Sequence, residues 1–217
     1  MIKNQLDITR YPRAALNMAA DLSMLETLPE HHRAFRLYIW PTASLTYGYN
    51  QKLPDRLAHL ESAKRPTGGG IVFHSPGDMV LSIAYFKDDP AFPKKASDLG
   101  FLSHYLSEVF KKASIPFNDN TNKGPKDTLF CATYENPYER YYNNQKIIGI
   151  STRRFRKKVL IQCIIHLENG HKHFSDSLLA NKYSSKGLLN YNSRSIQKYL
   201  KTQLNHLCKK TPFQWTS

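Results

Sequence analysis

Three consecutive glycines at residues 68–70 constrain this chain more than any other feature of its sequence. A backbone without Cβ atoms can approach a ligand closely, and its N–H groups can then bind an anion directly. Two cations, Lys64 and Arg65, precede the glycines, and an apolar stretch at residues 71–73 follows them. A glycine-lined turn of this kind, opening into a strand, predicts a site for a phosphate or an acyl phosphate. The same residues also fit a plain turn between two strands.

The spacing around the glycines excludes two common phosphate-binding motifs. It does not match the dinucleotide-binding fingerprint, and it does not match a P-loop, because no Lys-Ser or Lys-Thr follows the glycines. The chemistry of the loop therefore has to be inferred from the rest of the chain.

Length and cysteine usage favour one domain in a reducing compartment. The 217 residues are enough for one domain with a sizeable core. No apolar run reaches the roughly 18 residues of a membrane span, and the N-terminus lacks the apolar segment of a secretory signal. Cys131, Cys163 and Cys208 are too scattered for a disulfide framework or a zinc site. We therefore expect free thiols, a cytoplasmic location, no membrane partner and no metal site.

The chain is strongly basic. Its formal net charge is +14, from 31 Lys and Arg against 17 Asp and Glu. Such an excess predicts attraction to polyanions or to an acidic partner, and it predicts nothing about the fold. Part of it lies in residues 153–158, RRFRKK. Basic faces are often in contact with solvent alone, so the charge by itself does not indicate nucleic-acid binding. We therefore favour an acidic protein partner.

Periodicity predicts an α/β (α+β) fold with a mixed, largely antiparallel sheet and helices on one side of it. We expect helices at residues 12–28, 97–114 and 193–208, and strands at residues 35–40, 78–86 and 159–167. Ser97 is the expected N-cap of the second helix. Because the strands form hairpins and not repeated βαβ units, a doubly wound sheet is not expected.

Two turns and one loop complete the predicted layout. Asn143-Asn144 predicts a hairpin turn that places Lys146 at the start of the next strand, because Asn tolerates a positive φ. A second turn is expected within residues 155–158. Residues 116–129 lack periodicity and are expected to form a mobile loop that orders over bound substrate.

Four segments resemble one enzyme family. Residues 65–74, RPTGGGIVFH, closely resemble the signature loop of lipoate–protein ligases and octanoyltransferases, whose catalytic domain is shared with biotin–protein ligases. Residues 17–21, NMAAD, resemble the family's Asn-x-Ala-x-Asp helix, and residues 36–40, RLYIW, its RLYxW strand. Residues 48–51 match a Gly-x-x-Gln turn that lies beside the acyl pocket in the family. The Gly-Arg-Gly-Arg loop of biotin ligases is absent.

The resemblance spans roughly Asn17 to Leu167 and implies a fold and a domain organisation. We expect the biotin/lipoate protein ligase catalytic-domain fold as a single domain over residues 1–217. No separate C-terminal accessory domain, of the kind that some lipoate ligases carry, is expected.

The resemblance also implies candidate catalytic residues. Lys146 begins a Lys-Ile-Ile-Gly element that matches the family's Lys-x-x-Gly, whose lysine contacts the carbonyl and phosphate oxygens of an acyl-adenylate. An ammonium at that point stabilises the negative charge that develops on oxygen. Cys131, upstream of Lys146 with Tyr138-Glu139 between them, resembles the cysteine that forms an acyl thioester in the cysteine-dependent branch. The alternatives are a surface lysine without a role and a small buried cysteine.

Further residues are implied as contacts to substrate or nucleotide. These are Arg65, Thr67, Gly68, Gly69, Gly70, Ile71, Val72, Phe73, His74 and Gly149. The chain also departs from the family pattern, because residues 162–164 are Gln-Cys-Ile where Gln-His-Gly is usual, and Lys64 replaces the first arginine of a usual Arg-Arg pair. Lysine keeps the charge but loses the planar fork of arginine.

The function implied by the resemblance is attachment of a lipoyl or octanoyl group to a lysine of a lipoyl-carrier domain. In the ligase version ATP, Mg²⁺ and lipoate first give lipoyl-AMP, and Arg65 contacts its phosphate. The alternatives are an ATP-independent acyltransferase using Cys131 and a non-catalytic homologue that binds lipoate or nucleic acid. The expected partner is an acidic carrier domain of a 2-oxoacid dehydrogenase or glycine-cleavage type protein in a bacterial cytoplasm.

Overall fold

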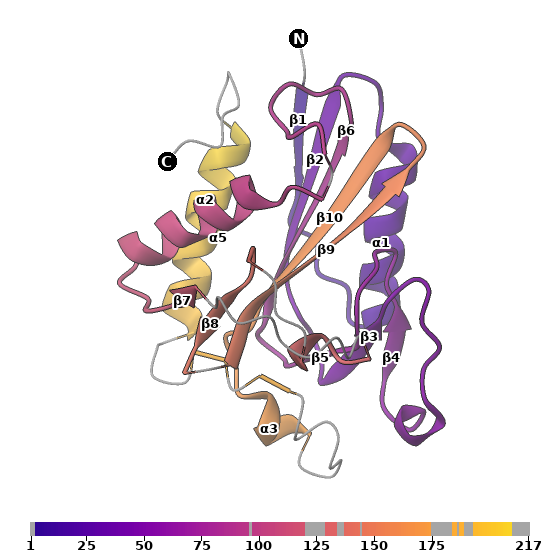
Figure 1. Cartoon of the computed structure of the whole chain (residues 1–217), viewed down its shortest axis with the longest axis vertical. Coiled ribbons are helices and arrows are strands. Elements are labelled where there is room, and N and C mark those ends of the chain that lie inside the picture. Colours follow the sequence, from indigo (N-terminus) through magenta and orange to yellow (C-terminus); the bar gives the residue numbers. More distant parts are fainter. Residues whose placement is uncertain are drawn as a thin grey trace.

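The computed structural model describes residues 3–95, 97–119, 129–133, 137–143, 145–174, 184–185, 187–188 and 193–209. Its strands are β1 (Lys3–Asp7), β2 (His32–Ile39), β3 (Ser44–Tyr47), β4 (Ser62–Lys64), β5 (Val72–His74), β6 (Met79–Phe86), β7 (Asn118–Asp119), β8 (Arg140–Tyr142), β9 (Gln145–Phe155) and β10 (Lys158–Ile165). Its helices are α1 (Ala14–Thr27), α2 (Gly100–Lys112), α3 (Gly170–His173) and α5 (Ser193–Lys209), with short 3₁₀ turns η1 (Asp55–Leu57) and η2 (Cys131–Thr133) (Figure 1).

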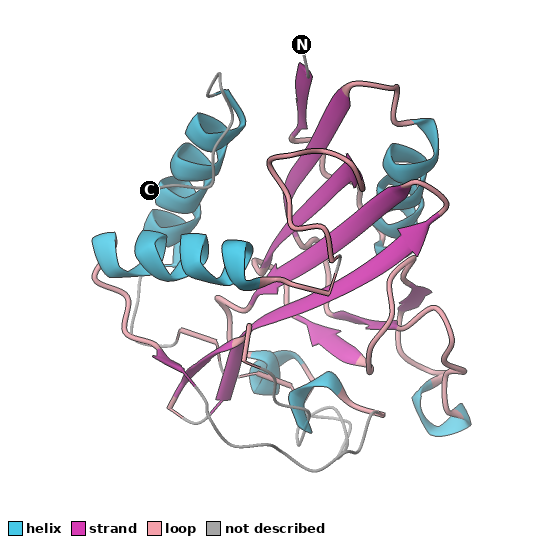
Figure 2. Ribbon diagram, turned by 45° about the horizontal axis from the view of Figure 1, so that its top comes forward, coloured by secondary structure: helices cyan, strands magenta, loops and turns pink. Residues whose placement is uncertain are grey.

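Two sheets form the centre of the described part of the chain. The larger one has the order β1-β2-β6-β10-β9-β8-β7 and is antiparallel except for the β1–β2 pair. The smaller one has the order β4-β3-β5, with β3 parallel to β4 and antiparallel to β5. The long β9–β10 hairpin crosses the molecule in Figure 2. The predicted mixed, largely antiparallel sheet is confirmed.

Helices cover both faces of the large sheet, so the prediction that they lie on one side is wrong. Met79, Leu81, Ile83 and Tyr85 of β6 share a core with residues of α2 and α5. The alternate β6 residues Val80 and Ala84 face the opposite way and pack with α1. Figures 1 and 2 show α2 and α5 on one side of the sheet and α1 on the other. The physical reason is that β6 and β10 are apolar on both faces, and each face needs a cover.

The predicted helices and hairpins are found close to their expected positions. Residues 12–28 contain α1, residues 97–114 contain α2, and residues 193–208 match α5. The turn residues Asn143 and Arg156 have φ of 47° and 54°, the left-handed region that a tight hairpin requires. Asn144 lies outside the described residues. No helix in the described ranges combines the length and the apolar character that crossing a membrane requires.

Two local predictions are corrected. Ser97 is not the N-cap of α2, because Leu99 occupies that position without a side-chain cap. The Asp98 carboxylate instead accepts a hydrogen bond from the Gly100 N–H at 3.2 Å. Within the predicted loop at residues 116–129, Asn118 and Asp119 pair with β8 as a short edge strand. Most of the rest of that loop lies outside the described residues.

Candidate active site

The glycine loop lies between β4 and β5 and is packed against the Gly-x-x-Gln turn. A Cβ atom on Gly48 would lie 2.2 Å from the Gly69 carbonyl oxygen, so only glycine allows this approach. The Gly48 N–H donates to Gln51 Oε1 at 3.0 Å, and Gln51 Nε2 donates to the Leu129 carbonyl at 3.3 Å. Gly69 itself has φ of 91°. The turn predicted to lie beside the site therefore supports the loop directly.

Arg65 fixes the conformation of the glycine loop through hydrogen bonds to its carbonyl groups. Its side chain is buried, and Nε and Nη2 donate to the Gly68 carbonyl at 3.1 and 2.8 Å. Nη2 also donates to the Gly70 carbonyl at 2.6 Å, and Nη1 donates to the Thr46 carbonyl and hydroxyl at 3.2 Å each. Burial lowers the pKa of Arg65 to about 10, so it remains a cation at neutral pH. Because these contacts use all five N–H donors of a guanidinium, the phosphate contact predicted for Arg65 requires it to release one of them.

A cavity of about 410 Å³ lies between the two sheets. One wall is apolar and consists of Met18, Trp40, Val72, Val80 and Ile164. Of the residues predicted to bind ligand, the structure brings Arg65, Gly68, Gly69, Gly70, Val72, His74 and Gly149 to the cavity. Ile71 and Phe73 alternate with Val72 along the chain, and their side chains pack on the opposite face with Leu45 and Phe130. An apolar wall opposite a glycine loop suits an acyl chain with a polar head.

The two predicted catalytic residues are in contact. The Cys131 N–H donates to the Ile71 carbonyl at 2.8 Å, and the Ile71 N–H donates to the Leu129 carbonyl at 2.6 Å, which fixes Cys131 next to the glycine loop. Cys131 is half-buried and lines the cavity. Lys146 Nζ donates to the Cys131 carbonyl at 2.6 Å and lies 3.7 Å from Cys131 Sγ. The lysine ammonium is therefore positioned to pair with a thiolate.

A third residue, Glu139, lies beside Lys146, and no role was predicted for it from the sequence. Its Oε2 lies 2.6 Å from Lys146 Nζ, and both side chains are almost fully buried. Burial raises the pKa of the Cys131 thiol; Lys146 and Arg65 lower it, and Glu139 raises it further. Burial alone would lower the pKa of Lys146, but Cys131 and Glu139 act against it and the net direction is upward. Glu139 belongs to the Tyr138-Glu139 pair noted in the sequence, but only the fold shows its partner.

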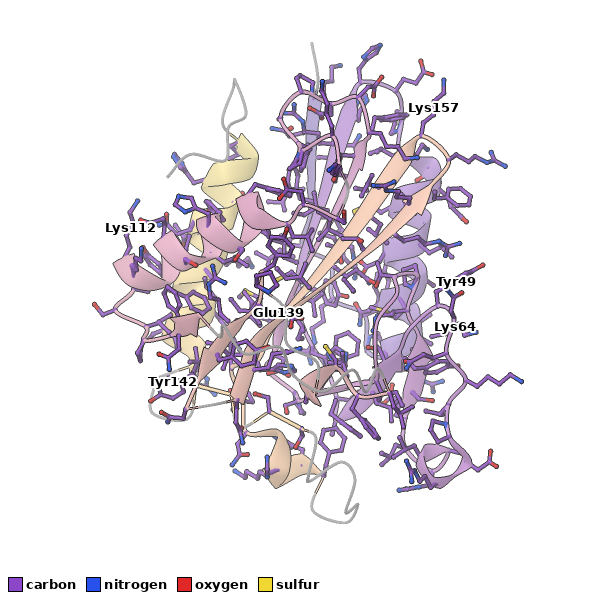
Figure 3. The ribbon with its side chains drawn as sticks, in the orientation of Figure 1. Tyr49, Lys64, Lys112, Glu139, Tyr142 and Lys157 are labelled. Carbon is purple, nitrogen blue, oxygen red and sulfur yellow. The ribbon has the colours of Figure 1, made fainter. Side chains whose placement is uncertain are left out.

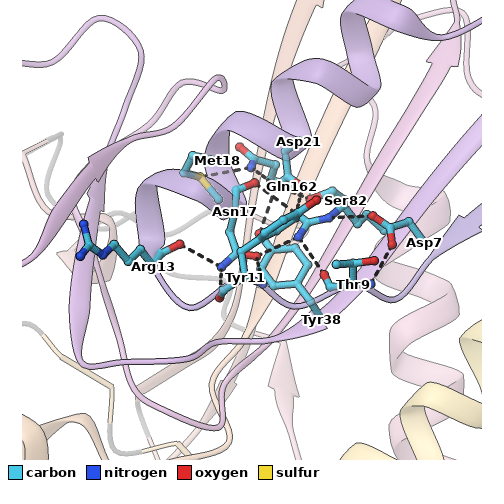
Figure 4. A network of polar contacts seen from close by, with 11 residues as sticks. Asp7, Thr9, Tyr11, Arg13, Asn17, Met18, Asp21, Tyr38, Ser82 and Gln162 are labelled. Atoms are coloured by element: carbon cyan, nitrogen blue, oxygen red, sulfur yellow. Dashed lines mark hydrogen bonds and ion pairs between the residues drawn. The ribbon is translucent and has the colours of Figure 1, made fainter.

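A buried polar network connects α1 with Tyr38, Ser82 and Gln162 of the large sheet (Figure 4), and the Thr67 hydroxyl extends it to the glycine loop. Asp21 accepts hydrogen bonds from Arg36 Nη1 at 2.6 Å and from Gln162 Nε2 at 2.6 Å. Gln162 Oε1 in turn accepts from the Thr67 hydroxyl at 2.6 Å, and Thr67 lies 2.7 Å from the Ser151 hydroxyl. Burial raises the pKa of Asp21, and Arg36 opposes that shift. Thr67, predicted to contact substrate, therefore positions the start of the loop.

The Gln-Cys-Ile segment at residues 162–164, which differs from the family's Gln-His-Gly, affects the packing around Gly149. Ile164 pairs with Gly149 across β9 and β10. A Cβ on Gly149 would lie 3.1 Å from Ile164 Cγ2 and 3.7 Å from Cys131 Sγ. The isoleucine side chain therefore lies against Gly149, and a Cβ at this position would displace it by a few tenths of an ångström. Cys163 points to the other face of the sheet, where it is buried.

Comparisons with known proteins identify the family of the chain. The model of the lipoyl protein ligase A/B catalytic domain matches residues 13–210. A curated relative, octanoyltransferase LipM from Clostridioides difficile (strain 630), is 30% identical over 165 residues, which cover 68% of this chain. The chain spans 59% of that relative's length.

Solved structures are similar in fold. A lipoate-protein ligase A bound with ATP superposes with a TM-score of 0.70 at 14% identity, covering 94% of this chain and 86% of that one. A T. acidophilum protein with bound lipoic acid gives a TM-score of 0.70 at 15% identity, with the same shares covered. At such identities the likeness concerns the fold. Together with the family model, which matches most of the chain, it confirms the resemblance: the chain belongs to the lipoyl protein ligase A/B catalytic domain family.

Proposed function

We propose that this protein is an acyltransferase that moves an octanoyl or lipoyl group, through a thioester on Cys131, to a lysine of a carrier domain. The observation that carries the proposal is the 3.7 Å approach of Lys146 Nζ to Cys131 Sγ at the wall of the cavity. A cation beside a cysteine favours the nucleophilic thiolate, and at Cys131 it acts against burial, which raises the pKa of the thiol. The similarity to an octanoyltransferase supports the same chemistry.

The reaction has two half-reactions that share the cysteine. In the first, the Cys131 thiolate attacks the carbonyl of an acyl thioester, a new S–C bond forms, and the donor thiol leaves with the proton that Cys131 gave up. In the second, the amine of the acceptor lysine attacks the Cys131 thioester, an amide forms, and the thiol is regenerated. In both half-reactions the Lys146 ammonium can stabilise negative charge on sulfur or oxygen. The apolar wall formed by Met18, Trp40 and Val80 would hold the acyl chain.

An ATP-dependent ligase is the second candidate. The glycine loop favours it, because its backbone can approach a phosphate. The saturated hydrogen bonding of Arg65 disfavours it, since that residue has no donor left for the phosphate in this arrangement. In either case we propose an acidic lipoyl-carrier domain as the acceptor. One ligase of this fold, from T. acidophilum, was studied together with its E2 lipoyl domain.

Intact-mass spectrometry separates the two candidates. The protein is incubated with octanoyl-pantetheine, or in parallel with lipoate, ATP and Mg²⁺. We expect one octanoyl adduct from the thioester donor, sensitive to hydroxylamine, which is lost in Cys131→Ala and retained in Cys163→Ala. Cys163 is the matched control: the residue also lines the cavity, but its side chain packs in the apolar core on the other face of the sheet. A retained lipoyl-AMP with Cys131 unmodified would instead establish the ligase.

A further inference from the structure

The buried carboxylate of Glu139 has no role in the two half-reactions above. Glu139 is 2% exposed, lies near the centre of the molecule (Figure 3) and lines the cavity. A charge in this position is costly unless it is paired and hydrogen-bonded. Both of its oxygens have partners, because Oε2 pairs with Lys146 and Oε1 accepts from the Ile150 N–H at 3.3 Å. The carboxylate is therefore held as an anion in a fixed position.

Glu139 and Cys131 share one cation. Lys146 Nζ lies 2.6 Å from Glu139 Oε2 and 3.7 Å from Cys131 Sγ, so its shorter contact is with the carboxylate. A Cβ on Gly149 would lie 3.7 Å from Cys131 Sγ and 3.9 Å from Glu139 Oε1, so the thiol and the carboxylate approach one small volume from two sides. Ionisation of the thiol would place a second anion next to a cation that already has one.

Three charged groups act on the Cys131 thiol. Lys146 reaches it from β9, Arg65 from beneath the glycine loop, and Glu139 from the residue before β8. The two cations favour a thiolate, and the carboxylate and burial oppose it. Burial is the largest of these influences on the pKa of the thiol, and Glu139 is the charged group that acts in the same direction as burial.

Resting on the proposed role of Cys131 as nucleophile, we propose that Glu139 is a positioning residue that holds the Lys146 ammonium and keeps the Cys131 thiol protonated in the free protein. A protonated thiol reacts slowly with electrophiles and oxidants, so the site is protected while no acyl donor is bound. Glu139→Gln keeps the shape of the side chain and removes its charge, which leaves Lys146 to pair with Cys131.

The pH profile of alkylation tests this directly. The rate of Cys131 alkylation by iodoacetamide is followed from pH 5 to pH 10 by peptide mass spectrometry, which separates Cys131 from the other cysteines. In Glu139→Gln we expect the pH at which the alkylation rate is half of its maximum, the midpoint of the profile, to fall by about one pH unit. At pH 7 the rate should rise roughly threefold, because a less basic thiolate is also a weaker nucleophile. A midpoint that is unchanged or higher would overturn the proposal.

Two further variants guard against a folding defect. Glu139→Gln/Lys146→Gln replaces the ion pair by two neutral amides, and we expect its midpoint to lie below that of Lys146→Gln alone; the reverse order would contradict the proposal. Glu108→Gln breaks a Glu–Lys pair of 2.8 Å at the surface of α2 and should leave the midpoint unchanged. Alkylation needs no acyl donor, so a shift without an octanoyl adduct would refute the proposed function and leave the role of Glu139 intact.

Discussion

At the scale of single residues, His74 is a base that the fold keeps neutral. Its ring stacks on Trp40 with centroids 3.9 Å apart, and Nε2 lies 2.8 Å from the Thr46 hydroxyl. Arg65 Nη1 donates to the same hydroxyl at 3.2 Å. Burial lowers the pKa of His74 well below its usual value, and His166 and Arg65 lower it further.

A neutral buried histidine makes stability depend on pH with a definite sign. Below about pH 6.5 the unfolded chain binds a proton at residue 74 that the folded protein does not, so stability is lost as the pH falls. One such group changes the free energy of unfolding by at most about 1.4 kcal/mol per pH unit. We therefore expect the loss of unfolding free energy between pH 7.5 and pH 5.5, measured by urea denaturation, to be smaller in His74→Gln than in the wild type.

The exposed His104 of α2 provides the control for this prediction. His104→Gln should keep the wild-type loss, because the side chain of His104 is exposed and is not buried on folding. If His74→Gln loses as much stability on acidification as the wild type does, His74 is not the group responsible.

The sequence indicates a candidate site residue when that residue stands in a motif of fixed spacing. It does not indicate a residue whose role depends on contacts made only in the fold. The glycines, Cys131 and Lys146 stand in motifs with fixed spacing. The structure places the glycines and Cys131 in the lining of one cavity and Lys146 against Cys131. Glu139 could not be assigned, because its role depends on a lysine on the neighbouring strand. Arg65 stands in the motif, yet its contacts go to the loop carbonyls, and the direction of a side chain is not encoded in spacing.

At the scale of elements, the Thr67 hydroxyl joins the glycine loop to β10 and α1. It donates to Gln162 Oε1 at 2.6 Å, and Gln162 donates to Asp21 of α1. Asp21 also accepts from the buried Arg36, whose side chain is 1% exposed. A loop held by a saturated chain of buried hydrogen bonds loses little order when it binds a ligand.

Thr67→Val removes this connection with little change in volume. Gln162 Oε1 loses its donor in a buried site, which should cost about 1–3 kcal/mol of unfolding free energy. We expect acyl transfer to fall as well, because the start of the loop is no longer fixed. Thr202→Val on the exposed face of α5 is the matched control and should change stability by less than about 0.5 kcal/mol. Equal effects of the two variants on denaturation would contradict this role of Thr67.

The elements themselves followed from local patterns, and their arrangement did not. Helical spacing located α1 and α5, and Asn143 marked a hairpin, because periodicity and turn chemistry are local properties. The face covered by each helix is a non-local property. The apolar character of both faces of β6 was the available sign that helices lie on two sides.

At the scale of the whole molecule, basic and aromatic side chains gather beside the glycine loop. The Arg153 guanidinium lies 3.9 Å from the centre of the Tyr49 ring, and Arg153 Nη1 donates to the Pro66 carbonyl at 3.2 Å. Tyr49 is 47% exposed, and Lys64, whose Nζ lies 5.8 Å from the centre of the Tyr47 ring, is at the same edge of the molecule (Figure 3). We call Tyr49, Lys64 and Arg153 the rim of the cavity. Because the chain as a whole has a net charge of +14, this rim would attract an acidic carrier and present the lysine of the carrier to the cavity.

Charge reversal at the rim tests that attraction. With an acidic lipoyl-carrier domain as acceptor, we expect Arg153→Glu to lower kcat/KM on the order of tenfold at low salt, because steering charge and the Tyr49 stack are lost together. Lys112→Glu makes the same charge change on the opposite side of the molecule (Figure 3) and should have a much smaller effect. At 1 M salt, where the Debye length is about 3 Å, the difference between the two variants should largely disappear. Equal losses at low salt would mean that net charge alone attracts the carrier and that the rim has no special part in docking.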